Sequence, residues 1–466
     1  MYNFYGCFVA LIVFEVFVIQ CDAVRNNAKR ARKLANDEVK LPYEVIGNIL
    51  HKGGLKATKG AGRSKALIAG SKDAMSRIFE DRILVIDNWT TLNRSVETSE
   101  RQEHKDGQFY FDFGSYARLV SLFETFGKHA RRISINYRSM NATVRREINK
   151  NIINKYANYL TELKIYVYND SGIWEEISNE NGQIQFPNVE KFTYVCDTAD
   201  SSRKSFNLNA IFPKLESFKL IGSIKDPNCL VNVTNLKELT LQTPSIPEHQ
   251  FQDIFAKNKK ISKLNFSPQK TETLQSIGKY LKNLQTLKIN SAGDEFLTGG
   301  NRVQNLTSVT TFVVGIDETR LLTGGLSFKM PNLKRLIVRG EYIDQQLSDF
   351  INHFKNLDMV EIKPYDGIYD AVECIEKLTS VKEYISPFNC SQLAFLEPFF
   401  ETFDRKKSHL NSLKLICIDN LKEGYSEAVM DYINDQLIAL KKPTWTLSDE
   451  MEDETNINYL LIKRNL

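Results

Sequence analysis

The chain has 466 residues, of which 42% are hydrophobic and 25% charged, and its formal net charge is +4. This balance is ordinary for a folded protein and by itself neither demands nor excludes a nucleic-acid partner. A dedicated nucleic-acid binder is usually more basic and its charges more clustered, and we expect no such partner. The length is too great for a single hydrophobic core, so we expect several domains or an elongated array of repeats.

The N-terminus predicts a signal peptide over residues 1–23. An apolar run from Phe8 to Ile19, interrupted only by Glu15, is followed by a plausible cleavage point after Ala23. An uncleaved anchor is the alternative, but the run is short for a membrane span. We therefore expect a secreted protein with no stable membrane insertion after the signal is removed, followed by a basic linker over residues 24–40.

The stretch LPYEVIGNIL, from Leu41 to Leu50, predicts a helix of about three turns. Pro42 stands at the first helical position, where its fixed φ suits a helix and its missing N–H costs nothing. The apolar residues recur at helical spacing and form one face, made of Leu41, Val45, Ile46, Ile49 and Leu50. Such a face suits either a groove in a partner protein or the end of the array that follows.

From residue 129 onward, a hexad with apolar residues at positions 1, 4 and 6 returns at a period of roughly 20 to 30 residues. The hexads are ARRISI (130–135), LTELKI (160–165), VEKFTY (189–194), LESFKL (215–220), LKELTL (236–241), ISKLNF (261–266), LQTLKI (284–289), VTTFVV (309–314), LKRLIV (333–338), LDMVEI (357–362), the degenerate VKEYIS (381–386) and LNSLKL (410–415). Residues 85–128 precede them as a connecting or N-terminal cap region.

This pattern is the signature of leucine-rich repeats, in which each hexad forms a short strand and the intervening segment returns by a helix or an irregular turn. We expect an α/β leucine-rich-repeat solenoid over residues 129–466, a horseshoe of about 12 or 13 units with a parallel inner sheet and a C-terminal cap. An open sheet of another α/β fold is the alternative. The Asn or Cys that the consensus places three residues after the hexad is absent, so we expect no side-chain ladder there.

The segments that precede three of the hexads are predicted to be helical, and prolines predict turns before three other hexads. The helical segments are PEHQFQDIFAKNKK before Ile261, TETLQSIGKYLKN before Leu284 and DQQLSDFINHFKN before Leu357. The prolines are Pro187, Pro213 and Pro331, which we expect to end a helix and turn the chain into the next strand.

Cysteines and histidines predict neither a disulfide framework nor a catalytic or metal site. Five scattered cysteines remain after signal removal, which is an odd number without a CxxC pair, so we expect mostly buried thiols and a reducing working compartment. Six histidines have no partner at motif spacing, and KGAGRSK (59–65) lacks the phosphate-loop spacing. We expect no enzymatic activity and no cofactor.

The helix LPYEVIGNIL matches the LPxEVxxxIL opening of an F-box, and SKDAMSRIFEDRIL (71–84) resembles its closing helix with a short apolar continuation. Residues 41–84 thus resemble an F-box-like helical module. The family joins an F-box to leucine-rich repeats, docks on the Skp adaptor of a cullin ubiquitin ligase and holds a target on the repeats. The resemblance implies an adaptor-binding set of Leu41, Pro42, Val45, Ile46, Ile49, Leu50 and Ile78.

With its signal peptide, the whole arrangement resembles the secreted F-box/leucine-rich-repeat effectors in the saliva of gall midges. That resemblance implies export from an insect gland and delivery into the cytoplasm of a host plant cell, which would explain a signal peptide without a disulfide framework. The alternative is an extracellular leucine-rich-repeat binding protein whose N-terminal helices only cap the solenoid.

Residues that alternate with the core positions of the hexads should face the concave side of the sheet. Exposed Tyr, Ile and Arg on a preformed surface favour a protein partner over a small molecule, although a solvated face without a ligand is also open. The expected partner-binding set is Lys164, Tyr166, Lys219, Lys263, Lys288, Arg335, Ile337, Arg339, Glu361 and Lys363. Asn265, in a glycosylation sequon, should share this face.

Overall fold

The computed structural model describes residues 65–87, 108–112, 116–138, 140–169, 173, 185–198, 207–222, 230, 232–243, 246–267, 271–290, 302–315, 326–339, 351–354, 356–363, 381–388, 412–417, 431, 435, 445–452 and 457–464. The chain divides into two compact units, Met1–Ile133 and Ser134–Leu466. The predicted signal peptide, the linker and the predicted helix at 41–50 lie outside the described residues.

In the part of the first unit that the structure describes, two helices accompany a pair of parallel strands. Their bounds are α4 Lys65–Asp81, β1 Ile83–Asp87, β2 Gln108–Asp112, α7 Tyr116–Phe126 and the 3-10 turn η3 Gly127–His129. The ring of Phe79 on α4 lies 5.1 Å from that of Phe123 and 5.7 Å from that of Phe126, both on α7. The two helices therefore share an aromatic core.

Every predicted hexad forms one strand, and each strand begins at the third residue of its hexad. The strands are β3 Arg132–Asn136, β4 Glu162–Asn169, β5 Lys191–Thr198, β6 Ser217–Gly222, β7 Glu238–Gln242, β8 Lys263–Phe266, β9 Thr286–Ile289, β11 Thr311–Gly315, β13 Arg335–Arg339, β14 Met359–Lys363, β15 Glu383–Phe388 and β16 Ser412–Cys417. Eleven of them, β4 to β16, pair in parallel in chain order. The prediction of an α/β protein with a parallel repeat sheet is confirmed, and the sheet is compatible with a solenoid.

Positions 4 and 6 of the hexads form the core on one face of this sheet. In the hexad of β7, for example, Leu239 is 2% and Leu241 is 1% exposed. Because the strands pair without a shift in register, Phe218 on β6 lies opposite both Phe192 and Leu239 on the neighbouring strands. No single repeat can bury these side chains alone, so stacking of neighbours supplies the burial.

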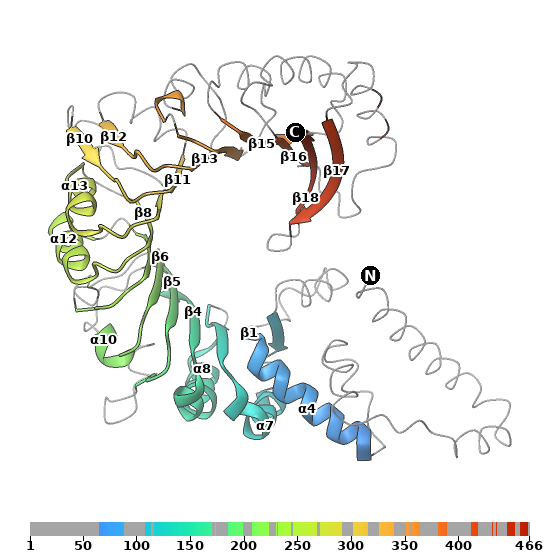
Figure 1. Ribbon diagram of the computed structural model, residues 1–466. Coiled ribbons are helices and arrows are strands. Elements are labelled where there is room, and N and C mark those ends of the chain that lie inside the picture. The colour runs from blue at the N-terminus through green and yellow to red at the C-terminus, as the bar shows by residue number, and fades with distance from the viewer. Residues whose placement is uncertain are drawn as a thin grey trace. The chain divides into compact units, whose positions relative to one another are not determined.

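Helices cover the core face of the sheet in the second unit. Their bounds are α8 Ala142–Ile148, the π-helical turn η4 Asn149–Asn154, the 3-10 turn η5 Ala157–Tyr159, α10 Leu208–Ile211, α12 Glu248–Lys257 and α13 Thr271–Tyr280. Figure 1 shows α10, α12 and α13 along one side of the strands. The helices predicted before Ile261 and Leu284 are confirmed as α12 and α13, and of the third, residues 351–353 are described as helical.

Two short strands lie between hexad strands in two of the repeats. β10 Arg302–Asn305 and β12 Leu326–Lys329 form a separate parallel pair. Pro213 follows α10, as expected, whereas Pro331 follows the strand β12. The expectation that Pro331 ends a helix is therefore wrong, although the chain turns there.

Asparagines placed just before the hexads, rather than after them, bridge adjacent repeats. Each side-chain amide donates a hydrogen bond to a main-chain carbonyl of the preceding repeat. The bonds of this asparagine ladder are Asn188 to Asn158 (2.8 Å), Asn283 to Lys259 (3.4 Å), Asn332 to Thr307 (2.8 Å) and Asn356 to Pro331 (2.9 Å). A ladder thus exists at the turn that leads into the strand.

Asn258 makes a buried bridge of the same kind at the end of α12. Its Nδ2 donates to the carbonyl oxygens of Val233 and Ile254, both at 2.8 Å, and its Oδ1 accepts from the N–H of Leu236 at 3.0 Å. The side chain is 0% exposed. It satisfies the buried carbonyl of Val233 and the buried N–H of Leu236, whereas the carbonyl of Ile254 also accepts from the main-chain N–H of Asn258.

An antiparallel hairpin ends the sheet at its C-terminal side. β17 Trp445–Glu452 pairs with β18 Ile457–Arg464, and β18 pairs antiparallel with β16. β17 is the last strand at this edge. The hairpin reverses the strand direction of the repeats and covers the edge of β16.

Candidate protein-binding face

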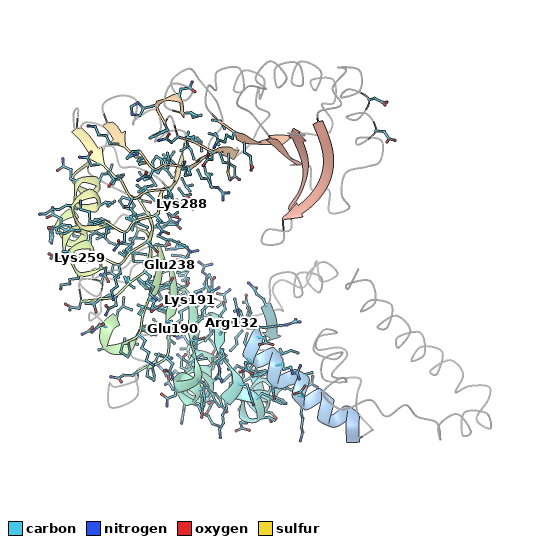
Figure 2. The ribbon with its side chains drawn as sticks, viewed as in Figure 1. Arg132, Glu190, Lys191, Glu238, Lys259 and Lys288 are labelled. Carbon is cyan, nitrogen blue, oxygen red and sulfur yellow. The ribbon has the colours of Figure 1, made fainter. Side chains whose placement is uncertain are left out.

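The side of the sheet away from the helices carries positions 3 and 5 of each hexad and the residue that directly follows the hexad, which we number position 7. We call this side the sheet face. Figure 2 shows Glu238 and Lys288 on this side, whereas Lys259 lies on the helical side. Register pairs place equivalent positions side by side, so position 5 forms one row across the strands. From β4 to β9 this row reads Lys164, Thr193, Lys219, Thr240, Asn265 and Lys288.

The sheet face of β4 to β9 is positively charged. Its three rows hold five lysines and two glutamates, while the remaining positions are neutral. We call these seven charged residues the lysine patch: Lys164, Lys191, Lys219, Lys263, Lys288, Glu162 and Glu238.

Both glutamates of the lysine patch already have a lysine partner. Glu162 lies 3.0 Å from Nζ of Lys164, and Glu238 lies 2.7 Å from Nζ of Lys263. The hydrogen bond from Lys263 is the main cause of a pKa of Glu238 below its ordinary value, and Ser217 also donates to this carboxylate, at 3.3 Å. Both carboxylates are therefore neutralised within the face.

Lys219 lies at the middle of the position 5 row and is exposed. It has no ion-pair partner among the residues that the structure describes. Its neighbours in the row are Thr193 and Thr240, which carry hydroxyl groups and no charge. The positive charge at this point of the face is therefore uncompensated.

An apolar row borders the patch at position 7. Tyr166, Val195 and Ile221 lie side by side on β4, β5 and β6. The guanidinium of Arg138 lies 5.9 Å from the centre of the Tyr166 ring and 2.5 Å from a carboxylate oxygen of Asp197. Tyr166 and Ile221 are half-buried and Val195 is buried, so the row offers a limited apolar surface with a polar margin.

The remaining predicted face residues lie on β13 and β14. Arg335 and Glu361 form an ion pair at 3.1 Å, and Glu361 is 4% exposed. The expectation of Glu361 as an exposed partner-binding residue is wrong, because Arg335 lies against it. Ile337 is half-buried opposite Glu361, and Arg339 lies in register with Lys363.

Three charged residues of the lysine patch are missing from the predicted set: Glu162, Lys191 and Glu238. All three stand at hexad position 3, in LTELKI, VEKFTY and LKELTL, so the alternation rule that found Lys263 also identifies them. Asn265 lies on this face as expected, since its neighbours in the chain, Leu264 and Phe266, belong to the core face. Its side chain is half-buried and accepts a hydrogen bond from Asn290. A glycan on Asn265 would occupy the middle of the face.

Ile78 alone of the predicted adaptor-binding set lies among the described residues. It is 0% exposed on α4, so its assignment to an accessible docking surface is corrected: it is a core residue. The other members lie outside the described residues, and they are Leu41, Pro42, Val45, Ile46, Ile49 and Leu50.

The described residues contain no group of His, Cys, Asp and Glu that could hold a metal ion. Cys196 on β5 is a buried free thiol whose Sγ lies 3.1 Å from the carbonyl oxygen of Thr198. Within the same described part of the chain, no helix has the length and apolar character needed to cross a bilayer.

Sequence comparisons leave the family open, since the chain matches no protein-family model and no curated protein.

Proposed function

We propose that the chain is a leucine-rich-repeat binding protein without enzymatic activity that holds a protein partner on its sheet face. The sheet face carries this proposal because rigid paired strands fix its side chains in register, which gives a preformed surface with little ordering cost. Lysines, threonines and an asparagine lie beside the apolar row of Tyr166, Val195 and Ile221. Polar groups around apolar contacts are typical of protein interfaces.

The test of this binding role blocks the face without changing its charge. Thr240→Trp adds a bulky ring at the middle of the face, and Lys259→Trp adds the same ring on the helical side (Figure 2). Affinity capture from host-plant extract, read by mass spectrometry, should recover a partner with the wild type and Lys259→Trp but lose it with Thr240→Trp. Equal recovery with all three proteins would refute binding at the face.

We further propose that the segment 41–50 docks the chain on the Skp-type adaptor of a host cullin ubiquitin ligase. The support is its LPxEVxxxIL pattern and apolar helical face. With Ile78 in the core, the proposed docking residues are Leu41, Pro42, Val45, Ile46, Ile49 and Leu50. Secretion and delivery into a host cytoplasm are part of the same proposal, and the buried free thiol of Cys196 is compatible with a reducing compartment.

A pull-down with a purified plant Skp adaptor tests the docking role. The double variant Leu41→Ala, Pro42→Ala should lose the adaptor, whereas Thr240→Trp should retain it, because the substitutions lie in different parts of the chain. No recovery with the wild type, or equal recovery with the double variant, would favour the extracellular alternative in which these helices only cap the repeats.

A further inference from the structure

The geometry points to an acidic, extended protein segment as the ligand of the lysine patch. We propose that this segment crosses the strands along the position 5 row and places carboxylates on Lys219 and Lys288. The inference rests on the proposed binding role of the sheet face and names the chemistry of the partner.

The charge balance of the patch favours an acidic ligand over a neutral or basic one. Five lysines stand against two glutamates, and each glutamate is already held by a lysine, Glu162 by Lys164 and Glu238 by Lys263. Lys219 is exposed between them and has no ion-pair partner in the described part of the chain. A carboxylate brought to Lys219 would gain an attraction without displacing an existing pair.

The spacing of the row fits an extended peptide. Thr240 and Asn265 separate Lys219 on β6 from Lys288 on β9, so the two lysines are three strands apart. At about 4.8 Å per strand this separation is roughly 14 Å. Residues i and i+4 of an extended peptide lie on the same side and about 13 Å apart, so two carboxylates with that spacing can reach both lysines.

The residues around the row favour a protein segment over a nucleic acid. The apolar row of Tyr166, Val195 and Ile221 begins beside Lys219 on β6 and continues to β4, where it offers a contact for apolar side chains at that end of the segment. Glu238 stands in the neighbouring row and is paired with Lys263, so this part of the face adds no uncompensated cation for a continuous phosphate backbone. A peptide needs carboxylates only at Lys219 and Lys288, whereas a phosphodiester chain carries a charge at every nucleotide.

Fluorescence anisotropy with the full chain tests the inference. The probe is a labelled twelve-residue Gly/Ser peptide with glutamate at every fourth position, and the matched control peptide has glutamine instead. The glutamate peptide should bind at least about ten-fold more tightly than the glutamine peptide, and added salt should weaken it because exposed charge pairs are screened.

Charge reversal then locates the site. Lys219→Glu should weaken binding of the glutamate peptide at least about ten-fold, and Lys219→Gln should weaken it less. Lys259→Glu, with the same charge change on the helical side, should bind within about two-fold of the wild type. Circular dichroism and melting temperature should be unchanged in Lys219→Gln, since Lys219 is exposed, so weaker binding by this variant reports on the site.

Three results would overturn the inference. They are equal binding of the two peptides, an equal loss with Lys259→Glu, or tighter binding of a labelled twelve-nucleotide oligo-dT that Lys219→Glu abolishes. The binding role of the face is judged separately by Thr240→Trp, which adds no charge. If that variant loses a captured partner while the glutamate peptide does not bind, the face binds a protein of different chemistry and only the present inference fails.

Discussion

Arg335 on β13 lies 3.1 Å from Oε2 of Glu361 on the neighbouring strand β14, and the Glu361 side chain is 5% exposed. Removing the cation would leave a buried carboxylate without this partner. Arg335→Ala should therefore lower the free energy of unfolding by about 1–3 kcal/mol, measured by urea unfolding.

Lys263→Ala is the matched comparison, because it removes a lysine from an ion pair on the same face. The side chains of Lys263 and Glu238 are 63% and 41% exposed, so the loss should stay below about 1 kcal/mol. Equal effects of the two variants would contradict the burial argument.

Glu238 gives the face a measurable pH dependence. Its pKa is lowered from 4.5, first by the hydrogen bond from Lys263, so the carboxylate is stabilised in the folded state. The stability that the ionised Glu238 contributes is complete when the pH is above the ordinary pKa, and it is lost as the pH falls through the lower pKa of the folded state. Glu238→Gln should lower the melting temperature slightly at pH 7, and the difference from wild type should shrink as the pH falls below 4.5 and vanish once the pH is below the lowered pKa of Glu238.

The control for this titration is Glu190→Gln. Glu190 is exposed and forms no ion pair with any residue that the structure describes. The melting temperature of Glu190→Gln should therefore stay close to that of the wild type at every pH. A difference for Glu238→Gln that persists unchanged in acid would rule out the carboxylate as its cause.

Gly222 at the end of β6 should tolerate no side chain. Its φ is +91°, and a Cβ there would lie 1.8 Å from the carbonyl oxygen of Cys196 on β5. Gly222→Ala should cost more than about 2 kcal/mol of stability, from the strained backbone and the displacement of β5. Thermal unfolding measures the loss.

Gly278→Ala is the control that distinguishes this clash from the general effect of replacing a glycine. Gly278 on α13 has no positive φ, and a Cβ there would lie 3.0 Å from the carbonyl oxygen of Asn305. The gain in helix propensity, up to about 1 kcal/mol, opposes the tight contact, so Gly278→Ala should change stability by less than about 1 kcal/mol. A small effect at Gly222 would refute the close approach of β5 and β6.

Asn258 and Asn356 allow the buried and exposed bridges between repeats to be compared. Asn258→Ala leaves the carbonyl of Val233 and the N–H of Leu236 without this side chain in a buried site, and should cost about 2–4 kcal/mol. Asn356→Ala removes one exposed bond to Pro331 and should cost about 1 kcal/mol or less. Hydrogen exchange should show faster exchange around Leu236 only in the first variant.

The sequence predicted the repeat strands well because their cause is local. Burial at positions 1, 4 and 6 leaves a pattern of apolar residues in the hexads. Even the degenerate VKEYIS, with Ser386 at position 6, forms β15, because its main chain pairs with the neighbours β14 and β16. β1 carries buried Leu84 and Ile86 at positions 4 and 6, but Asp81 stands at position 1, so the pattern did not identify it.

Contacts between side chains on neighbouring strands depend on the strand register, so they could not be predicted from the sequence. The partners Lys263 and Glu238 lie on different repeats, and the burial of Glu361 follows from Arg335 on the strand beside it. The asparagine ladder was missed because the consensus places its asparagine after the hexad, whereas Asn332 and Asn356 come before theirs.

The hairpin of β17 and β18 has a consequence for assembly. Parallel repeats can in principle stack without limit, so the free edge of β16 could have accepted a strand from another molecule and begun a filament. β18 occupies that edge in the opposite direction. With β17 as the outermost strand, the edge that the parallel repeats themselves would offer is already paired, and the parallel array ends within one molecule.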